Sequence, residues 1–459
     1  MATHSSTITS GFIDIATYDE MEKYAYGGGD ATAYFVKEVR KSNWFTIIPV
    51  PLARSSGSPD FGQEWSVNVV RSGDYLLNTW LRVKLPSVTL LASNSAGATG
   101  RIRWTKNFMH NLINKAEILF NDLQAQYFSN YHLDFWSQFA IPEGKQNGYN
   151  NMIGNLEGLV DPHGPDNPLS EVYLNLPIPF FFSRDSGVAL PCAALPFNEI
   201  QIRFAFQNWE NLLIFEDVSL VGNKKKNIIV GPTEDIAMEP KLTNVAVWAE
   251  YALVSNEERR KMACGARDIL IEQVQTAPRF TFNPIQNVEP SFDIRFSHSI
   301  KVLFFAVRNA THKNEWSNYT SASPVVTPLG FKNIKDDDPI IQTSLIYENQ
   351  NRLANMGSDY FSLVSPYYRA PRIPSQTGMH MYSYALDFTD LDPTGSTNYG
   401  KLNNVSIIPK ASDACIIGAD GTGGPDSGMN YPQKYEFVIT AINHNIIRIV
   451  GGALGFPVL

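Results

Sequence analysis

A phosphate-loop spacing, G-x-x-x-x-G-K, occurs at residues 395–401. Such a loop wraps nucleotide phosphates with its backbone amides, and the residue after the lysine must be Ser or Thr to reach the magnesium ion. Leu402 stands there and carries no hydroxyl. A phosphate loop also leads from a strand into a helix, whereas here Asp392-Pro393 precedes the loop and residues 405–409 after it have a strand pattern. The sequence therefore predicts no nucleotide cofactor here.

Other side chains with catalytic potential are scattered. The eight histidines form no HExxH or HxH group, and His110 and His132 are far apart, which favours packing or hydrogen-bonding roles. Arg184-Asp185-Ser186 contains groups found in hydrolases, but a nucleophile needs a base placed in three dimensions, so we interpret it as a turn held by an Arg–Asp pair. The three cysteines lack CxxC spacing. We therefore predict no catalytic residue, no metal site and no cofactor.

Charge and targeting signals exclude further classes of function. With 37 basic and 45 acidic residues the net charge is -8, and the tight basic run at residues 224–226 is only three residues long. Binding to nucleic acid phosphates needs a concentrated basic face, so no direct contact with nucleic acid is expected. The amino terminus lacks a signal-peptide pattern, Ala2 stands where myristoylation needs glycine, and no run of about 18 apolar residues occurs. We expect no secretion, no membrane span, and synthesis in a reducing compartment.

The composition is typical of a β-rich protein with a weakly charged surface. Charged residues make up 18%, below the roughly 25% of ordinary soluble domains, which suits burial against neighbours. The 28 Pro and 31 Gly interrupt the chain too often for many long helices, and the 27 Phe and 20 Tyr favour strands. Strand-like runs occur at residues 44–50, 65–70, 75–83, 171–176, 200–206, 245–254, 269–274, 292–296, 300–307, 379–388 and 435–450.

Helical and irregular segments separate these strands. A four-residue spacing of apolar side chains predicts a helix over residues 121–139. Ser255 with Glu258 forms a capping box that predicts a short helix over residues 257–262, and a second interruption with helical character lies near residues 359–364. Long irregular stretches are expected over residues 141–170, 311–339 and 390–432.

The strand pattern stops at the capping box and then starts again, which predicts two antiparallel β-sandwiches side by side. We expect an amino-terminal arm over residues 1–29, a first sandwich over residues 30–254, a short helical linker over residues 255–267 and a second sandwich over residues 268–459. The halves share no alignable repeat. Their similar architecture fits an old duplication without proving one.

Several sequence blocks resemble the major capsid proteins of iridoviruses and, more distantly, those of other nucleocytoplasmic large DNA viruses. They keep the family order and cover essentially the whole chain. The blocks are residues 10–14, 104–107, 109–112, 120–122, 179–187 (PFFFSRDSG), 189–191, 258–260, 271–275, 295–298, 395–400 and 443–449 (NHNIIRI). Trp44 and residues 60–66 and 131–136 look most similar to the invertebrate iridescent viruses.

The resemblance implies an all-β fold of two tandem eight-stranded antiparallel jelly rolls with short helical insertions. It implies a homotrimer that forms a pseudo-hexagonal capsomer and tiles an icosahedral shell beside neighbouring capsomers. It also implies a place in the virion capsid, assembled in the host cytoplasm, with minor capsid proteins as partners and an internal viral membrane nearby that the chain does not span. The alternative from another class is a cellular jelly-roll carbohydrate-binding protein or a glycoside-active enzyme.

The segment of residues 1–29 is predicted to be an assembly arm. Its Ser/Thr-rich start cannot bury enough apolar surface to order itself alone. It nevertheless carries apolar side chains that are costly to leave in water, namely Phe12, Ile13, Ile15, Tyr18, Met21 and Tyr24. The resemblance implies that this segment lies at the base of the capsomer. The alternative is a strap packed on its own subunit.

Overall fold

The structure is a computed structural model that describes residues 44–91, 100–165, 167–217, 226–227, 236–323, 337–421 and 432–457. All helices and strands named below belong to one compact unit, Phe45–Leu459. The predicted arm, with Phe12, Ile13, Ile15, Tyr18, Met21 and Tyr24, lies outside the described residues.

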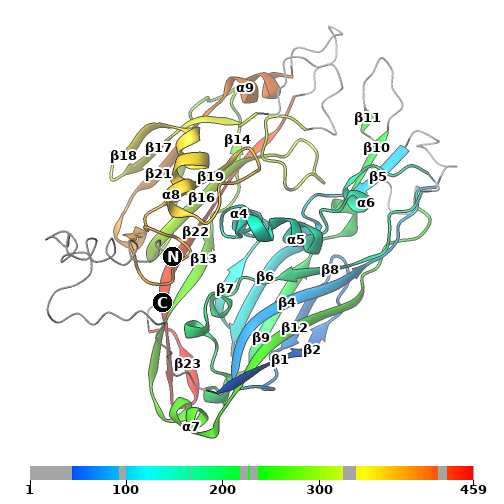
Figure 1. The fold of residues 1–459 in the computed structure, drawn as a ribbon. Helices are drawn as coiled ribbons and strands as arrows, with labels where there is room; N and C mark the ends of the chain where they lie inside the picture. Colours follow the sequence, from blue (N-terminus) through cyan, green and yellow to red (C-terminus); the bar gives the residue numbers. More distant parts are fainter. Residues whose placement is uncertain are drawn as a thin grey trace, which may run out of the picture. The chain divides into compact units, whose positions relative to one another are not determined.

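Two antiparallel sheets enclose the core of the first half (Figure 1). Sheet A has the strand order β1-β12-β4-β8, with bounds β1 Phe45–Pro51, β4 Tyr75–Leu85, β8 Val172–Pro177 and β12 Thr243–Val254. Sheet B has the order β2-β3-β9-β6-β7, with bounds β2 Ala53–Gly57, β3 Glu64–Asn68, β6 Ile113–Phe120, β7 Leu123–Phe128 and β9 Ile200–Phe206. A smaller sheet joins β5 Gly100–Trp104, β10 Leu213–Asp217 and β11 Lys226–Asn227. Residues of β9 alternate between buried and half-buried, as in a strand with one core face.

The second half repeats the two-sheet arrangement. Sheet C has the order β13-β22-β16-β19, with bounds β13 Arg267–Thr276, β16 Ser299–Asn309, β19 Met379–Ser383 and β22 Tyr435–Val450. The short strands β14 Phe280–Phe282, β20 Thr397–Asn398 and β23 Ala453–Gly455 extend it. Sheet D has the order β15-β21-β17-β18, with bounds β15 Phe292–Asp293, β17 Ile340–Tyr347, β18 Gln350–Gly357 and β21 Val405–Ala411. The two sandwiches and the mostly extended chain confirm the all-β prediction.

Strand β16 is buried on both faces. One face, with Leu303 and Phe305, packs in the core between sheets C and D. The other face, with Val302 and Phe304, packs against helix α4 (Asn130–Phe139) from the first half. This two-sided burial explains why residues 302–307 of the strand are all apolar, because a strand with one wet face would alternate.

Strand β22 connects all three hydrophobic clusters. Phe437 and Ile439 belong to the second core, Ile442 belongs to the cluster around α4, and Ile447 and Ile449 belong to the core of the first half. The carboxyl-terminal end of the chain therefore completes a core that is built mostly from residues before position 254.

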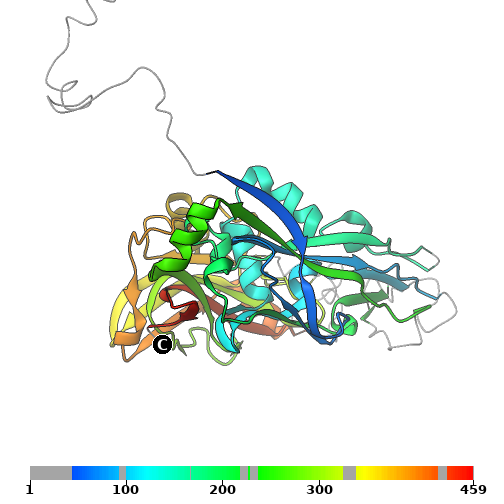
Figure 2. The same ribbon diagram turned by 90° about the horizontal axis from the view of Figure 1, so that it is seen from below.

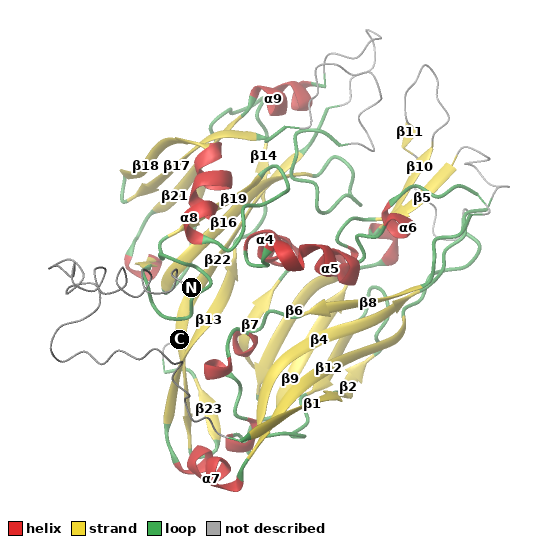
Figure 3. Ribbon diagram, viewed as in Figure 1, coloured by secondary structure: helices red, strands yellow, loops and turns green. Residues whose placement is uncertain are grey.

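Helix α4 lies between the two halves, and further helices flank the sheets (Figure 3). Their bounds are α3 Phe108–Leu112, α4 Asn130–Phe139, α5 Glu143–Ile153, α6 Glu157–Val160, α7 Asn256–Cys264, α8 Ser365–Arg369 and α9 Asp413–Asp420. Single helical turns occur at η2 Phe181–Ser183, η3 Ser186–Val188, η4 Cys192–Ala194, η5 Trp209–Asn211, η6 Tyr360–Val364 and η7 Tyr399–Lys401. No helix in the described ranges is long and apolar enough to cross a bilayer.

The helix predicted over residues 121–139 is wrong in its first part. Asn121 and Asp122 adopt left-handed backbone angles, with φ of 49° and 63°, and form the tight turn between β6 and β7. The helix starts only at Asn130. The stretches predicted to be irregular also contain structure, since residues 141–170 hold α5 and α6, and residues 390–432 hold β20, β21 and α9.

Helix α7 joins sheet A to sheet C, near the helix predicted from Ser255 and Glu258. Ser255 occupies the N-cap position, but its side chain makes no capping hydrogen bond, so the capping box is not formed. Arg259 instead binds the buried carboxylate of Asp74 through Nε and Nη2, at 2.7 and 3.1 Å. Burial alone would raise the pKa of Asp74, but the hydrogen bonds from Arg259 and the Val254 amide hold it below its ordinary value. Arg259 thus fixes α7 to the first half.

The fold predicts a large cost for removing Phe304, which lies between rings of Phe135, Phe139 and Phe388 at centroid distances of 5.3–5.9 Å. Phe304→Ala should lower the free energy of unfolding by about 3–5 kcal/mol, because it leaves a cavity between the halves. Urea denaturation at fixed protein concentration measures this. The matched control is Phe197→Ala, whose side chain is 73% exposed and should cost little. Equal losses in both variants would contradict the assigned packing.

Candidate functional site

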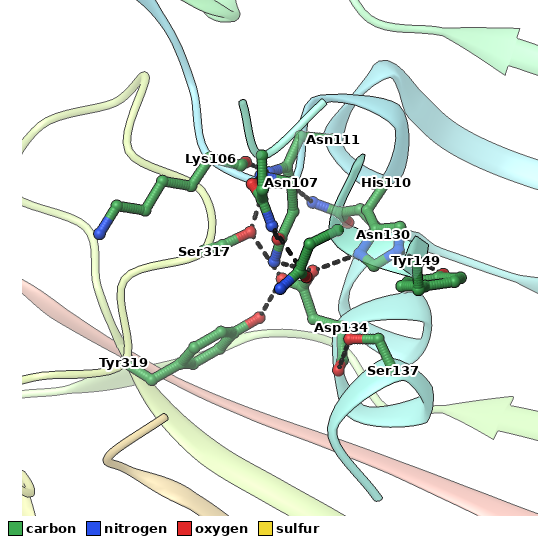
Figure 4. Close-up of polar contacts among 12 residues, drawn as sticks. Lys106, Asn107, His110, Asn111, Asn130, Asp134, Ser137, Tyr149, Ser317 and Tyr319 are labelled. Carbon is green, nitrogen blue, oxygen red and sulfur yellow. Dashed lines mark hydrogen bonds and ion pairs between the residues drawn. The ribbon is translucent and has the colours of Figure 1, made fainter. Parts of the chain in front are cut away.

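A buried polar network joins the two halves, and we call its members the polar junction (Figure 4). The first half contributes side chains from α3, α4, α5 and the residue before α3, and the second half contributes two from the loop after β16. The members are Asn107, His110, Asp134, Tyr149, Ser317 and Tyr319.

Local backbone geometry sets the first-half side of the junction. Asn107 has a left-handed φ of 51° at the N-cap of α3, a conformation that Asn tolerates better than most residues. Asn107 forms two hydrogen bonds with the side chain of Asn155. The backbone N–H of Asn107 donates to Oδ1 of Asn155 at 2.7 Å, and Nδ2 of Asn155 donates to Oδ1 of Asn107 at 2.6 Å. The start of α3 is thereby fixed, and His110 points toward Asp134 on α4 (Figure 4).

Asp134 is the centre of the junction and is fully buried. Its Oδ1 accepts from Nδ2 of Asn107 at 2.8 Å and contacts Nδ1 of His110 at 2.7 Å. Its Oδ2 accepts from Oγ of Ser317 at 2.7 Å and from the hydroxyl of Tyr319 at 2.8 Å. Four partners compensate the desolvation of one carboxylate, and two of them come from the other half of the chain.

The His110–Asp134 contact resembles part of a catalytic site, but its surroundings are structural. Both side chains are 0% exposed, and the second ring nitrogen of His110 is already bonded to the Tyr149 hydroxyl at 2.7 Å. Burial and the Asp134 charge raise the pKa of both Tyr149 and Tyr319, so both phenols stay neutral. With each of these groups bonded to a neighbour, the arrangement holds the halves together.

The loop after β16 adds backbone contacts to the same interface. Nδ2 of Asn314 donates to the carbonyl oxygens of Glu210 and Leu213 at 2.8 and 2.6 Å. The indole N–H of Trp316 donates to the carbonyl oxygen of Asn211 at 2.9 Å. These bonds satisfy backbone carbonyl groups near the small sheet. The loop therefore fixes the second half to the first through directional hydrogen bonds as well as through buried apolar surface.

An ionic cluster forms a second polar link, and it corrects the predicted Arg184–Asp185 pair. Arg184 bonds instead to Glu272 on β13 at 3.3 Å and lies over the Trp136 ring at 4.2 Å. Lys301 on β16 is fully buried and bonds to the same carboxylate at 2.6 Å. Within the described part of the chain, Asp185 accepts from the backbone N–H of Gly187, two residues on. The long Arg side chain reaches a carboxylate that the sequence could not place beside it.

His132 has the packing role that the sequence predicted. Its ring packs against Phe128 and Trp136. Burial, with a smaller contribution from the Arg184 charge, lowers the pKa of His132 to about 3, so the ring is neutral at physiological pH. His110 likewise has the predicted hydrogen-bonding role.

A Ser–His–Asp cluster that the sequence analysis missed lies in the second half. Oγ of Ser358 donates to Oδ2 of Asp338 at 2.6 Å, and Nε2 of His380 lies 2.5 Å from that Oγ and 2.9 Å from the same Oδ2. In a catalytic triad the Asp and the Ser contact different ring nitrogens. Here both contact Nε2, while Nδ1 of His380 has no hydrogen-bond partner among the described residues. The serine proton goes to the carboxylate, so the histidine does not activate this serine.

The phosphate-loop spacing folds into a turn. Residues 397–401 form β20 and the single 3-10 turn η7, the backbone N–H of Gly400 donates to Oδ1 of Asn398, and the chain then enters strand β21 without an α-helix. Both the flanking structure and Leu402 thus differ from a phosphate-binding loop. Across the described residues, no three His, Cys, Asp or Glu side chains lie close enough to hold a metal ion.

The junction predicts that the charge of Asp134 is needed for stability. Asp134→Asn keeps the shape of the side chain but places an amide N–H₂ against groups that donate hydrogen bonds to the carboxylate. This substitution should lower the free energy of unfolding by about 3 kcal/mol. Thermal and urea unfolding measure the loss. Asp161→Asn, at an exposed carboxylate, is the control and should change stability by less than about 0.5 kcal/mol. An Asp134→Asn variant with an unchanged free energy of unfolding would show that the network contributes no stability.

Two family models together match most of the chain. "Major capsid protein N-terminus" matches residues 33–254, and "Large eukaryotic DNA virus major capsid protein" matches residues 258–455. The structure is similar to a PBCV-1 virus capsid model, with a TM-score of 0.71, 19% identity, and coverage of 93% of this chain and 100% of that chain. It is also similar to the Faustovirus major capsid protein, with a TM-score of 0.69, 11% identity and 95% coverage of each chain. These neighbours identify the fold as a double jelly roll.

Relatives with high identity extend over the full length. The chain is 60% identical to the major capsid protein of Invertebrate iridescent virus 6, over 100% of each chain, and 60% identical to that of Tipula iridescent virus, over 98% of each. Identity to the major capsid protein of Rana tigrina ranavirus is 47%, over 99% of each. The predicted similarity to invertebrate viruses is confirmed, and the chain belongs to the iridescent-virus major capsid proteins, within the major capsid protein family of large eukaryotic DNA viruses.

Proposed function

We propose that three copies of this chain form a pseudo-hexagonal capsomer that tiles the flat facets of an icosahedral capsid. The observation that carries this proposal is the pair of similar sandwiches in one chain, joined by the cluster around α4 and by the polar junction. Three chains then supply six sandwiches around one axis, which approximates a hexagon. A block with six similar sides can pack beside six neighbours, and many modest contacts repeated by symmetry can close a shell.

The surface supports self-association. Large apolar side chains are exposed on the single subunit, among them Trp44 at 85% and Met238 at 77%. The low share of charged residues, 18%, reduces the desolvation cost of covering such a surface. A lone subunit would leave these groups in water, whereas a capsomer and its neighbours can bury them.

Family membership supports a proposal for the wider assembly. We propose assembly in the host cytoplasm and a place in the virion capsid, with neighbouring capsomers and minor capsid proteins as partners. The internal viral membrane lies nearby without being spanned, and the chain makes no direct contact with nucleic acid. We assign it no catalytic role. A carbohydrate-binding protein or glycoside-active enzyme is the alternative, and full-length similarity to capsid proteins argues against it.

The proposal predicts a stable trimer. Sedimentation of purified protein at micromolar concentration should give about three times the chain mass, because a monomer would expose the apolar surface described above. The same measurement in high salt should still give a trimer, since apolar burial is not screened. A clean monomer at every concentration would contradict the proposal.

The predicted arm gives a second test. Deletion of residues 1–26 should leave folded trimers with an unchanged melting temperature that fail to form shells, because the arm acts between or under capsomers. Full-length protein is the assembly control, and electron microscopy of assembly mixtures is the measurement. If the truncated chain unfolds or aggregates, the segment belongs to the subunit core and the strap interpretation is right.

A further inference from the structure

The outer face of sheet A carries an apolar groove. Trp80 on β4 and Trp248 on β12 are cross-strand partners whose rings stack with centroids 6.1 Å apart. Trp80 lines a groove of about 610 Å³ together with Trp136, Ile141 and Met152. The outer face of an antiparallel sheet is normally polar, since it meets water. Tryptophans at this place indicate a surface that another molecule covers.

An aromatic projection lies at helix α8 in the second half. Tyr367 and Tyr368 are 68% and 71% exposed and pack edge to face at 5.0 Å. Leu363 and Val364, in the turn η6 just before α8, are also exposed. Figures 1 and 2 show α8 on the same side of the molecule as α4 and α5, which border the groove.

We propose that α8 of one copy docks into the sheet A groove of the next copy around the threefold axis; this rests on the proposed trimer. In a ring, each subunit uses two different patches, one for each neighbour. In a threefold ring these patches face directions only about 60° apart, because each subunit occupies a third of a turn. A projection and a groove on one side of the molecule fit that requirement, whereas patches on opposite sides would build an open chain.

Charge favours the same pairing. Glu250 lies in the groove and accepts from Nδ2 of Asn78 at 2.8 Å, and Arg369 is the last residue of α8. Neither Glu250 nor Arg369 forms an ion pair with another residue in the described part of the chain. Docking brings these opposite charges together, and it places the ammonium group of Lys145, on the groove wall, beside the tyrosine rings. Trp, Tyr and Arg are also the residues that dominate binding energy at interfaces.

Crosslinking between copies tests the contact directly. The exposed Cys264 is first replaced by Ser, while Cys192 and Cys415 are buried and do not react. In that background, Lys145→Cys with Tyr368→Cys, treated with a short bismaleimide, should give covalently linked species up to three chain masses on a denaturing gel. Each single variant is a control. Phe197→Cys with Tyr368→Cys is a control pair in which both sites are exposed but are not placed together.

A charge reversal gives an independent readout. Arg369→Glu should weaken trimer formation at least about tenfold in sedimentation, and Glu250→Arg in the same chain should restore it, while circular dichroism stays unchanged. Trimers that neither crosslink at this pair nor respond to the reversal would overturn the interface and leave the proposed function intact. A wild-type chain that sediments as a monomer would overturn the proposed function itself.

Discussion

The contact between helix α4 and the outer face of strand β16 is the constraint on which the arrangement of the molecule depends. A strand as apolar as β16 cannot leave one face in water, and the first half provides the cover through Phe135 and Phe139 against Phe304. The second half is therefore not a self-sufficient sandwich. Its outer surface becomes an interior surface only when the first half is in place, so the two halves behave as one rigid block.

Polar groups give that block its precise geometry. Apolar packing tolerates small shifts, whereas the four bonds to Asp134 and the shared carboxylate of Glu272 hold only at particular distances and angles. Each network takes atoms from both halves, so a shift of one half removes part of the hydrogen bonding or ion pairing of a buried charge. A subunit whose copies must meet repeatedly at the same angles benefits from such directional links.

Local sequence patterns predicted the strands well where apolar residues follow the spacing of a strand. The strand-like runs predicted at residues 200–206 and 435–450 correspond to β9 and β22 with the same bounds. The helix predicted to begin at residue 121 was wrong because the four-residue spacing of apolar side chains continues from strand β7 into α4, and only the extended backbone of Ser129 separates the strand from the helix. Helix α5 was missed because its Gly and Asn residues hide a helix that tertiary packing stabilises.

The polar junction could not be predicted at all. Asp134 and Tyr319 are distant in sequence, and neither stands in a motif with a known spacing. The resemblance identified blocks at residues 109–112, 179–187 and 271–275 without saying what they do. The structure explains them: they hold His110, which bonds to Asp134 of the polar junction, and Arg184 and Glu272, whose ion pair joins the halves.

The path of strand β22 has a consequence for synthesis on the ribosome. Ile447 and Ile449 complete the core of the first half, yet they are made after almost every other residue. At about 5–20 residues per second, the first half waits roughly ten to forty seconds after residue 254 for these side chains. During that interval its core stays incomplete and its apolar surface needs protection from aggregation. Only a finished chain can present a finished subunit, so prematurely ended chains are kept out of the growing shell.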